Sequence, residues 1–213
     1  MATNHLFWHL ATYNDGTVSM APPHHQLIAI AGIEVREDQA IAWIRQSADT
    51  GTLVRMLDTA FGRAHHVTSF SGTNFGLPVI ISNALRTNTV IDTTLQKVGS
   101  DAISHTDLAK ELQGLTNPDG FMGFDFLCHL CNLPKRMDLD IAATWTSSDP
   151  KVQKKIGKRL LVDVVLIALG YTHFQHVSGV WHEKHAKRFR RSIIDAAAQK
   201  AKVVTKMFGG KPA

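Results

Sequence analysis

Four segments of the chain carry the apolar pattern of β-strands. The clearest is 26–36, where apolar residues occupy both alternating faces, as in a strand that is buried on both sides of a sheet. The sequence Ala21-Pro22-Pro23 precedes it and forces an extended entry into the strand. Weaker patterns of the same kind predict three further strands at 6–13, 40–45 and 67–70. We therefore expect a sheet with 26–36 as a central strand.

Apolar residues recur at helical spacing in other parts of the chain. Gly62 is expected to stop the first helix, and Leu77-Pro78 to open the second, because proline is tolerated in a first helical turn. Asn117-Pro118-Asp119-Gly120 predicts a turn between two short helices. The predicted helices cover 53–61, a segment from Leu77, 105–114, 124–132, 153–171 and 183–208. Strands followed by mixed strands and helices predict a layered α/β domain.

The composition is that of a folded protein. Its 213 residues are 44% apolar and 19% charged, so the chain can bury a core as one domain, and general disorder is excluded. The clean apolar run 27–33 is too short to span a membrane, and the N-terminus lacks the features of a secretory signal. Two cysteines do not make a disulfide scaffold, which fits a reducing compartment. We expect a soluble cytoplasmic protein without a membrane partner.

The net charge of +5 is concentrated at the C-terminal end. Residues 182–213 contain nine Lys or Arg and only two acids, which leaves the rest of the chain with a net charge of −2. This asymmetry predicts DNA or RNA as a partner, because Lys and Arg release condensed counterions when they contact phosphates. A solvated helix face has the same composition, so that alternative stays open. The expected nucleic-acid-binding residues are Lys184, Lys187, Arg188, Arg190, Arg191 and Lys202.

The predicted 183–208 helix also has a wide, alanine-rich apolar stripe. This stripe is compatible with a homodimer. With Trp43 and Trp181 as anchors, the basic helix is equally suited to an acidic protein partner. The sequence leaves these partners open beside nucleic acid.

Several short stretches match motifs of one family. The most specific is Ser71-Gly72-Thr73-Asn74-Phe75-Gly76-Leu77-Pro78-Val79, which matches the pattern Asn-Gly-x-x-Phe-Asp-Leu-Pro-Val. The other matching stretches are Leu6 to Thr12, Pro22 to Ala31, His105-Thr106-Asp107-Leu108, Leu133-Pro134-Lys135-Arg136-Met137 and Arg159 to Val164. In this order they resemble, over roughly residues 6–172, the predicted 3′–5′ exonuclease family related to the proofreading domain of family-B DNA polymerases. The resemblance implies a ribonuclease-H-like mixed sheet flanked by helices at 1–175, followed by a basic C-terminal helix and tail at 182–213.

The departures from the family pattern concern its active site. Such exonucleases hold two divalent metals between four carboxylates. In this chain the four acidic positions are occupied by His9, Ala11, Gly76 and Asp163, so only Asp163 is acidic. Arg159 stands where the third motif of the family has a tyrosine. One carboxylate and one imidazole do not replace the charge that a pair of hard cations requires. We therefore expect no catalytic residues and no metal cofactor.

An active enzyme would need a relocated site for Mg²⁺ or Mn²⁺. The acids that could compensate are Glu34, Asp107 and Asp140, and the weak candidate ligands are Asp163, Asp107 and His9. Three hypotheses follow. In the favoured one, the chain is an inactive exonuclease-like protein that binds nucleic acid through a basic surface. The alternatives are a protein-interaction scaffold or inhibitor, and an active metal-dependent 3′–5′ exonuclease.

Two other constellations have a simpler explanation. Cys128 and Cys131, with His173-x-x-His176 or His182-x-x-His185, have the composition of a zinc site. Both cysteines also fall on an apolar helical stripe, which favours packed core residues. Several aromatic side chains could stack on unpaired bases: Phe7, Trp8, Phe70, Phe75 and Trp145. For Phe7 and Phe75, packing in the core is expected instead.

Overall fold

The computed structural model describes residues 4–16, 21–37, 39–92, 103–116 and 123–208. Within these residues lies a five-stranded sheet with the order β3-β2-β1-β4-β5. β1, β2 and β3 pair antiparallel, whereas β4 pairs parallel with both β1 and β5, so the sheet is mixed. The strands are β1 (Asn4–Tyr13), β2 (Gln26–Arg36), β3 (Gln39–Gln46), β4 (His66–Ser69) and β5 (Ser104–Asp107).

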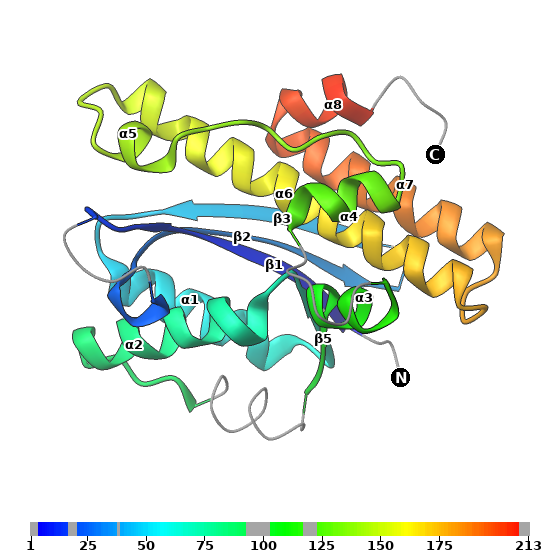
Figure 1. Cartoon of the computed structure of the whole chain (residues 1–213), viewed down its shortest axis with the longest axis horizontal. Helices are drawn as coiled ribbons and strands as arrows, with labels where there is room; N and C mark the ends of the chain where they lie inside the picture. The colour runs from blue at the N-terminus through cyan, green and yellow to red at the C-terminus, as the bar shows by residue number, and fades with distance from the viewer. Residues whose placement is uncertain (1–3, 17–20, 38, 93–102, 117–122, 209–213) are drawn as a thin grey trace.

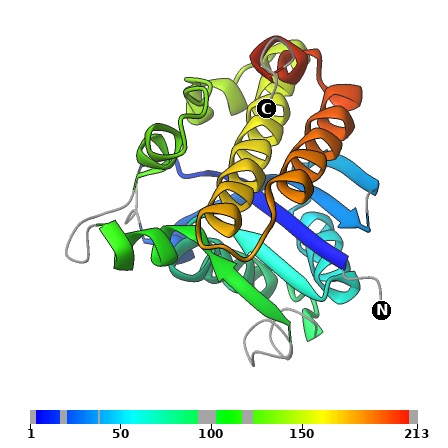
Figure 2. The ribbon, with the colours of Figure 1, turned by 90° about the vertical axis from the view of Figure 1, so that its right-hand side faces the viewer.

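Helices cover both faces of the sheet (Figure 1). α1 (Thr50–Arg63) and α2 (Leu77–Thr87) lie on one face, and α6 (Pro150–Val177) and α7 (Glu183–Lys200) lie side by side on the other (Figures 1 and 2). The shorter helices are η1 (Pro22–His24), η2 (Gly72–Gly76, a π-helical turn), α3 (Leu108–Thr116), α4 (Phe124–Leu130), α5 (Ile141–Trp145) and α8 (Lys202–Phe208). The α/β class and the mixed sheet flanked by helices, both expected from the sequence, are confirmed.

The alternation along β1 divides the core into two apolar layers. Phe7 and Ala11 pack under α6 and α7, whereas Leu6, Trp8 and Leu10 pack against α1 and α2. β2 is buried from Leu27 to Val35, as its doubly apolar pattern predicted. The sheet therefore supplies a scaffold whose two faces carry different sets of side chains.

The long helix α6 lies at the centre of the apolar layer that also contains Phe7 and Ala11. The helix has 28 residues, and its most apolar window of 18 residues has a mean hydropathy of 1.4, which would allow it to cross a membrane by length and composition alone. However, 72% of the apolar window is buried inside the protein. It therefore has the environment of a core helix.

The C-terminal segment is two helices, so the prediction of one helix over 183–208 is wrong. Ala201 has an extended conformation (φ −148°, ψ 113°) and separates α7 from α8. The apolar stripe nevertheless packs inward: Phe189, Ile193 and Val204 belong to the same core layer as α6. Burial of Ala201 at the break explains why the apolar pattern alone does not reveal it.

Other boundaries also differ from the prediction. The segment 105–114 contains a strand end and a helix, because Ser104–Asp107 pairs parallel with β4 despite its polar sequence. Gly62 lies inside α1, which ends at Arg63, so it is not the stop. α6 begins earlier and ends later than 153–171, because Asp149 caps its first turn ahead of Pro150. The predicted turn at 117–120 lies outside the described residues.

Candidate functional site

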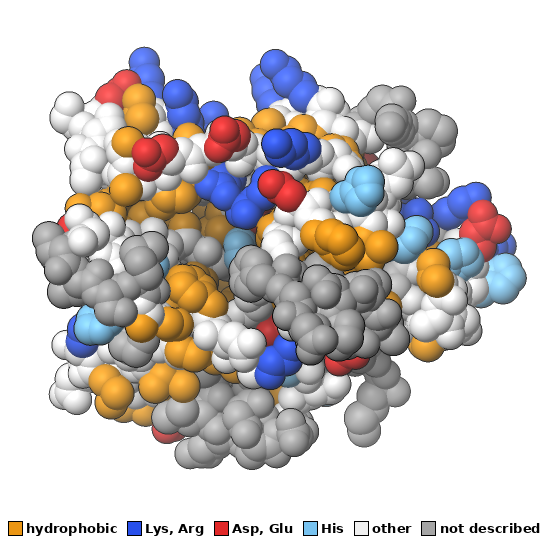
Figure 3. All heavy atoms as spheres, viewed as in Figure 1, with side chains coloured by type: hydrophobic (Ala, Val, Ile, Leu, Met, Phe, Trp, Pro, Cys, Tyr) orange, Lys and Arg blue, Asp and Glu red, His pale blue; other side chains and the backbone are white. Residues whose placement is uncertain are grey.

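A small pocket opens between β1 and α6. Its volume is about 150 Å³, and its lining includes His9 and Ala11 from β1, Arg136 from the segment that follows α4, and Arg159 and Asp163 from α6. We call it the Asp163 pocket. Figure 3 shows a hollow on this face of the molecule with Lys or Arg side chains at its edge. The fold thus brings together four of the five residues that the sequence placed at the family's active-site positions.

Asp163 is paired with two arginines at the floor of this pocket. Its side chain is 2% exposed, and Oδ2 accepts a 2.7 Å hydrogen bond from Nη2 of Arg136. Nε of Arg159 lies 3.6 Å from the same oxygen, one helical turn away on α6. Two guanidinium groups therefore surround the carboxylate that the family pattern retains.

Other contacts fix both arginines in place. The guanidinium of Arg136 lies 4.5 Å from the centroid of the Phe124 ring, a cation–π contact. Arg159 donates a 2.8 Å hydrogen bond from Nη1 to the carbonyl oxygen of Leu139. The segment 132–140 is thereby tied to α6 through the charges at Asp163.

His9 is the fourth polar side chain of the pocket. Nε2 lies 4.0 Å from Oδ2 of Asp163. The pKa of His9 is lowered to about 4, mainly by burial; Asp163 raises it, and Arg136 and Arg159 lower it. Burial also lowers the pKa of Arg159, although a guanidinium stays protonated at neutral pH. At pH 7 the pocket thus holds two positive charges, one negative charge and a neutral imidazole.

Gly76, the fifth motif position, is on the other side of the sheet. A Cβ added to Gly76 would lie 2.7 Å from Cη2 of Trp8, which packs toward α1 and α2. The indole of Trp8 therefore fills the space that a side chain at this position would need. An aspartate at 76 requires Trp8 to move.

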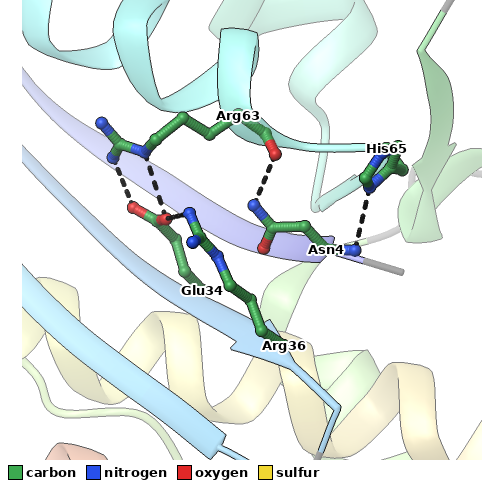
Figure 4. Close-up of polar contacts among 5 residues, drawn as sticks. All are labelled: Asn4, Glu34, Arg36, Arg63 and His65. Carbon is green, nitrogen blue, oxygen red and sulfur yellow. Dashed lines mark hydrogen bonds and ion pairs between the residues drawn. The ribbon is translucent and has the colours of Figure 1, made fainter. Parts of the chain in front are cut away.

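The acids that could have compensated have other partners. Glu34 lies on the opposite face from His9, where Arg63 donates to Oε1 at 2.6 Å and Arg36 lies 3.6 Å from Oε2 (Figure 4). Asp107 accepts hydrogen bonds from the backbone N–H groups of Ser71, Thr73 and Ala109. The side chain of Asp140 caps α5 by accepting from the N–H of Ala143.

The donor set does not fit a pair of divalent metals. Hard cations such as Mg²⁺ require oxygen ligands, mostly carboxylates, and the Asp163 pocket offers one carboxylate that two arginines already neutralise. Within the described ranges of the chain, no three His, Cys, Asp or Glu side chains form a group that could hold a metal. We therefore assign no chemical step to a metal in this pocket.

The remaining candidates divide between core and surface. Cys128 and Cys131 are buried in the apolar layer under α6, and burial raises the pKa of each thiol to about 11, as expected of packed cysteines. Phe7 and Trp8 are less than 2% exposed, so neither is placed to stack on bases. The basic residues are exposed on α7 and α8, apart from the partly buried Arg190: Lys184, Lys187, Arg188, Arg191 and Lys202.

Sequence reasoning missed the role of Arg136. The residue was visible within the Leu133 to Met137 stretch, but its separation from Asp163 by 27 positions hid their pairing. None of the predicted basic residues of α7 and α8 lines the Asp163 pocket. The site and the basic helices are therefore two separate features.

The mixed sheet, the helices on both faces and the pocket between the first strand and a long helix define an exonuclease-like α/β protein with a ribonuclease-H-like fold. More specifically, the chain belongs to the family described as "Predicted 3'-5' exonuclease related to the exonuclease domain of PolB", whose model matches residues 20–209. This match confirms the resemblance inferred from the motifs, and it extends through α7 and α8.

The fold is also similar to that of a solved polymerase. The family B DNA polymerase from the hyperthermophilic archaeon Pyrobaculum calidifontis superposes with a TM-score of 0.66 over 95% of this chain, at 12% sequence identity. The chain spans 29% of the length of that polymerase, so the similarity concerns the fold of one part of it. No curated protein matches the sequence significantly.

Proposed function

We propose that the chain is a catalytically inactive, exonuclease-like protein that binds nucleic acid and uses no metal cofactor. The observation that carries this proposal is the pairing of Asp163 with Arg136 and Arg159. A metal pair would have to displace two guanidinium groups from the single retained carboxylate and would then face their positive charge. Without bound cations, the family's way of activating water and stabilising the leaving oxygen has no support.

The basic surface of α7 and α8 supports nucleic acid as the partner. Its exposed cations can contact phosphates, and the pocket adds net positive charge where the family carries several carboxylates. Among these cations, Lys187 lies 2.8 Å from Glu183 and Arg191 lies 3.2 Å from Asp195. Such exposed pairs contribute little, so both cations can exchange their partners for phosphates.

A nuclease assay tests the inactive part of the proposal. We expect an end-labelled single strand to stay intact with Mg²⁺ or Mn²⁺, and Asp163→Ala to behave identically. Digestion that requires the metal and disappears in Asp163→Ala would contradict the proposal and establish an active exonuclease.

Fluorescence anisotropy with a labelled oligonucleotide tests the binding part. If about four cations contact phosphates, raising the salt from about 50 to 300 mM weakens binding roughly 100-fold. Replacing Lys184, Lys187, Arg188 and Arg191 by Gln should weaken binding at low salt and flatten the salt dependence. The matched control removes four exposed lysines of α6 instead: Lys151, Lys154, Lys155 and Lys158.

The control variant should retain most of the affinity. Equal losses in both variants would mean that net charge alone matters, and would contradict an interface on α7 and α8. Affinity that does not change with salt would contradict nucleic-acid binding through the basic surface. So would purification with a stoichiometric protein and no nucleic acid, which would support the scaffold alternative.

A further inference from the structure

A second, larger pocket lies at the opposite end of α6. Its volume is about 430 Å³, and rings from β1, β4, α6, α7 and the α6–α7 turn line it together with Val35 and Glu37. We call it the ring pocket. The rings belong to His5 of β1, His66 of β4, Tyr171 of α6, Trp181 of the α6–α7 turn, and His185 and Phe189 of α7. In Figure 2, the end of the sheet where α6 passes into α7 faces the viewer.

The rings form a corner of nearly perpendicular planes. Trp181 makes angles of 85° with Tyr171 and 67° with Phe189, at centroid distances of 5.7 and 4.7 Å. The ring of His185 stands at 85° to Trp181, with the centroids 4.6 Å apart. A flat aromatic guest can therefore stack on one ring while its edge meets the face of another.

The framework behind the corner is held by hydrogen bonds and burial. Nε2 of His5 lies 2.8 Å from Oγ1 of Thr68, and Nε2 of His66 lies 3.0 Å from Oγ1 of Thr106. Burial lowers the pKa of both histidines, that of His66 to about 4, so these imidazoles are neutral at pH 7. The back of the pocket is consequently uncharged and fixed in orientation.

One acidic residue lines the pocket, and two cations neighbour its α7 residues in the sequence. Lys184 and Arg188 each precede a pocket residue of α7 by one position, which puts them about 100° further round the same helix. Both are exposed. Glu37, also exposed, supplies a carboxylate that can accept hydrogen bonds from a guest. The surroundings thus combine cations for phosphate, an acceptor for N–H groups and rings for stacking.

We propose that the ring pocket binds an unpaired nucleobase of a single strand whose phosphates are contacted by Lys184 and Arg188. The base stacks on the rings of Trp181 and His185, which are partly exposed, whereas Tyr171 is buried. Its N–H groups donate to Glu37. This inference rests on the proposed function and specifies where and how the strand binds.

The pocket is distinct from the one around Asp163. Tyr171 lies eight residues beyond Asp163 on α6, a rise of roughly 12 Å. His5 and His9 are four residues apart on β1, which separates them by roughly 13 Å. The base site therefore lies at the end of the sheet away from the family's active-site positions.

A pair of matched strands tests the inference with the unaltered protein. One is a thymidine oligomer, and the other has equal length and phosphate number but abasic sugars throughout. We expect the abasic strand to bind about tenfold more weakly, with an unchanged salt dependence. Equal binding of the two strands would overturn the base site and leave the proposed function standing. Failure of both strands to bind would overturn the proposed function, and the base site with it.

Trp fluorescence locates the contact. The thymidine oligomer should quench the emission, and Trp181→Phe, which keeps a ring, should abolish most of the quenching. His185→Ala should weaken binding of the thymidine strand several-fold but not that of the abasic strand, whereas the exposed His129→Ala serves as control. Unchanged quenching in Trp181→Phe would place the base elsewhere and overturn the inference. Quenching by tetramethylammonium, but not by the oligomer, would identify a cation site and overturn it as well.

Discussion

At the scale of single residues, Asp163 has changed its partners while keeping its place on α6. In the family pattern this position belongs to a set of metal ligands, and here its buried carboxylate faces Arg136, Arg159 and a neutral His9. The substitution at 159 and the arginine at 136 thus act together. The arginines of the chain itself neutralise Asp163, in place of bound metal cations.

Replacing Asp163 by Asn should therefore destabilise the protein. The change leaves two largely buried guanidinium groups without a counterion, which costs about 3 kcal/mol of the free energy of unfolding. Urea denaturation at pH 7 measures this loss. The exposed Asp92→Asn is the control. If the carboxylate served only to bind metal, Asp163→Asn would leave the stability of the metal-free protein unchanged.

Buried histidines should make the fold sensitive to acid. The native pKa values of His9 and His66 are about 4, against about 6.5 in the unfolded chain, and the pKa of His5 is also well below 6.5. The unfolded state therefore takes up protons first as the pH falls. Stability should be complete above pH 6.5 and should decrease toward pH 4, by at most about 1.4 kcal/mol per pH unit for each histidine.

Denaturation series at pH 7, 6 and 5 measure this dependence. His66→Asn should reduce the slope, and the exposed His129→Asn should leave it unaltered. Stability that stays constant from pH 7 to 5 would show that these rings are protonated without cost.

At the scale of elements, strong local patterns predicted what local packing determines. β2 was predicted because both of its faces are apolar, and the motif Ser71 to Val79 correctly placed the start of α2. β5 was missed because its four residues are polar and acquire a strand conformation only by pairing with β4. The break at Ala201 was missed because the apolar stripe continues on both sides of it.

The basic helix α7 should contribute fully to the stability of the whole fold. Ile193 is completely buried against the layer under α6, so Ile193→Ala should cost about 2–5 kcal/mol in a single cooperative transition. Ile194, which is only partly buried, provides a neighbouring control with a smaller loss. A helix attached loosely to an independent domain would instead leave the main unfolding transition unaffected by Ile193→Ala.

At the scale of the whole molecule, the Asp163 pocket and the ring pocket lie on the same face of the sheet, toward opposite ends of α6. The motifs predicted the residues of the Asp163 pocket, except that Arg136 joins them from a separate segment. The ring pocket could not be predicted, because its rings come from β1, β4, α6, α7 and the α6–α7 turn, and no single stretch of sequence contains them. The pocket forms only when folding brings these elements together.

Binding of Mn²⁺ tests the central claim most directly. Free Mn²⁺ can be counted by electron paramagnetic resonance while the protein is titrated, and Asp163→Asn provides the reference for sites that do not involve the pocket. The pairing of Asp163 with Arg136 and Arg159 predicts identical, weak titrations for both proteins. Tight binding of about one or two Mn²⁺ ions per chain that disappears in Asp163→Asn would contradict the central claim. Such ions would have displaced the arginines from the carboxylate.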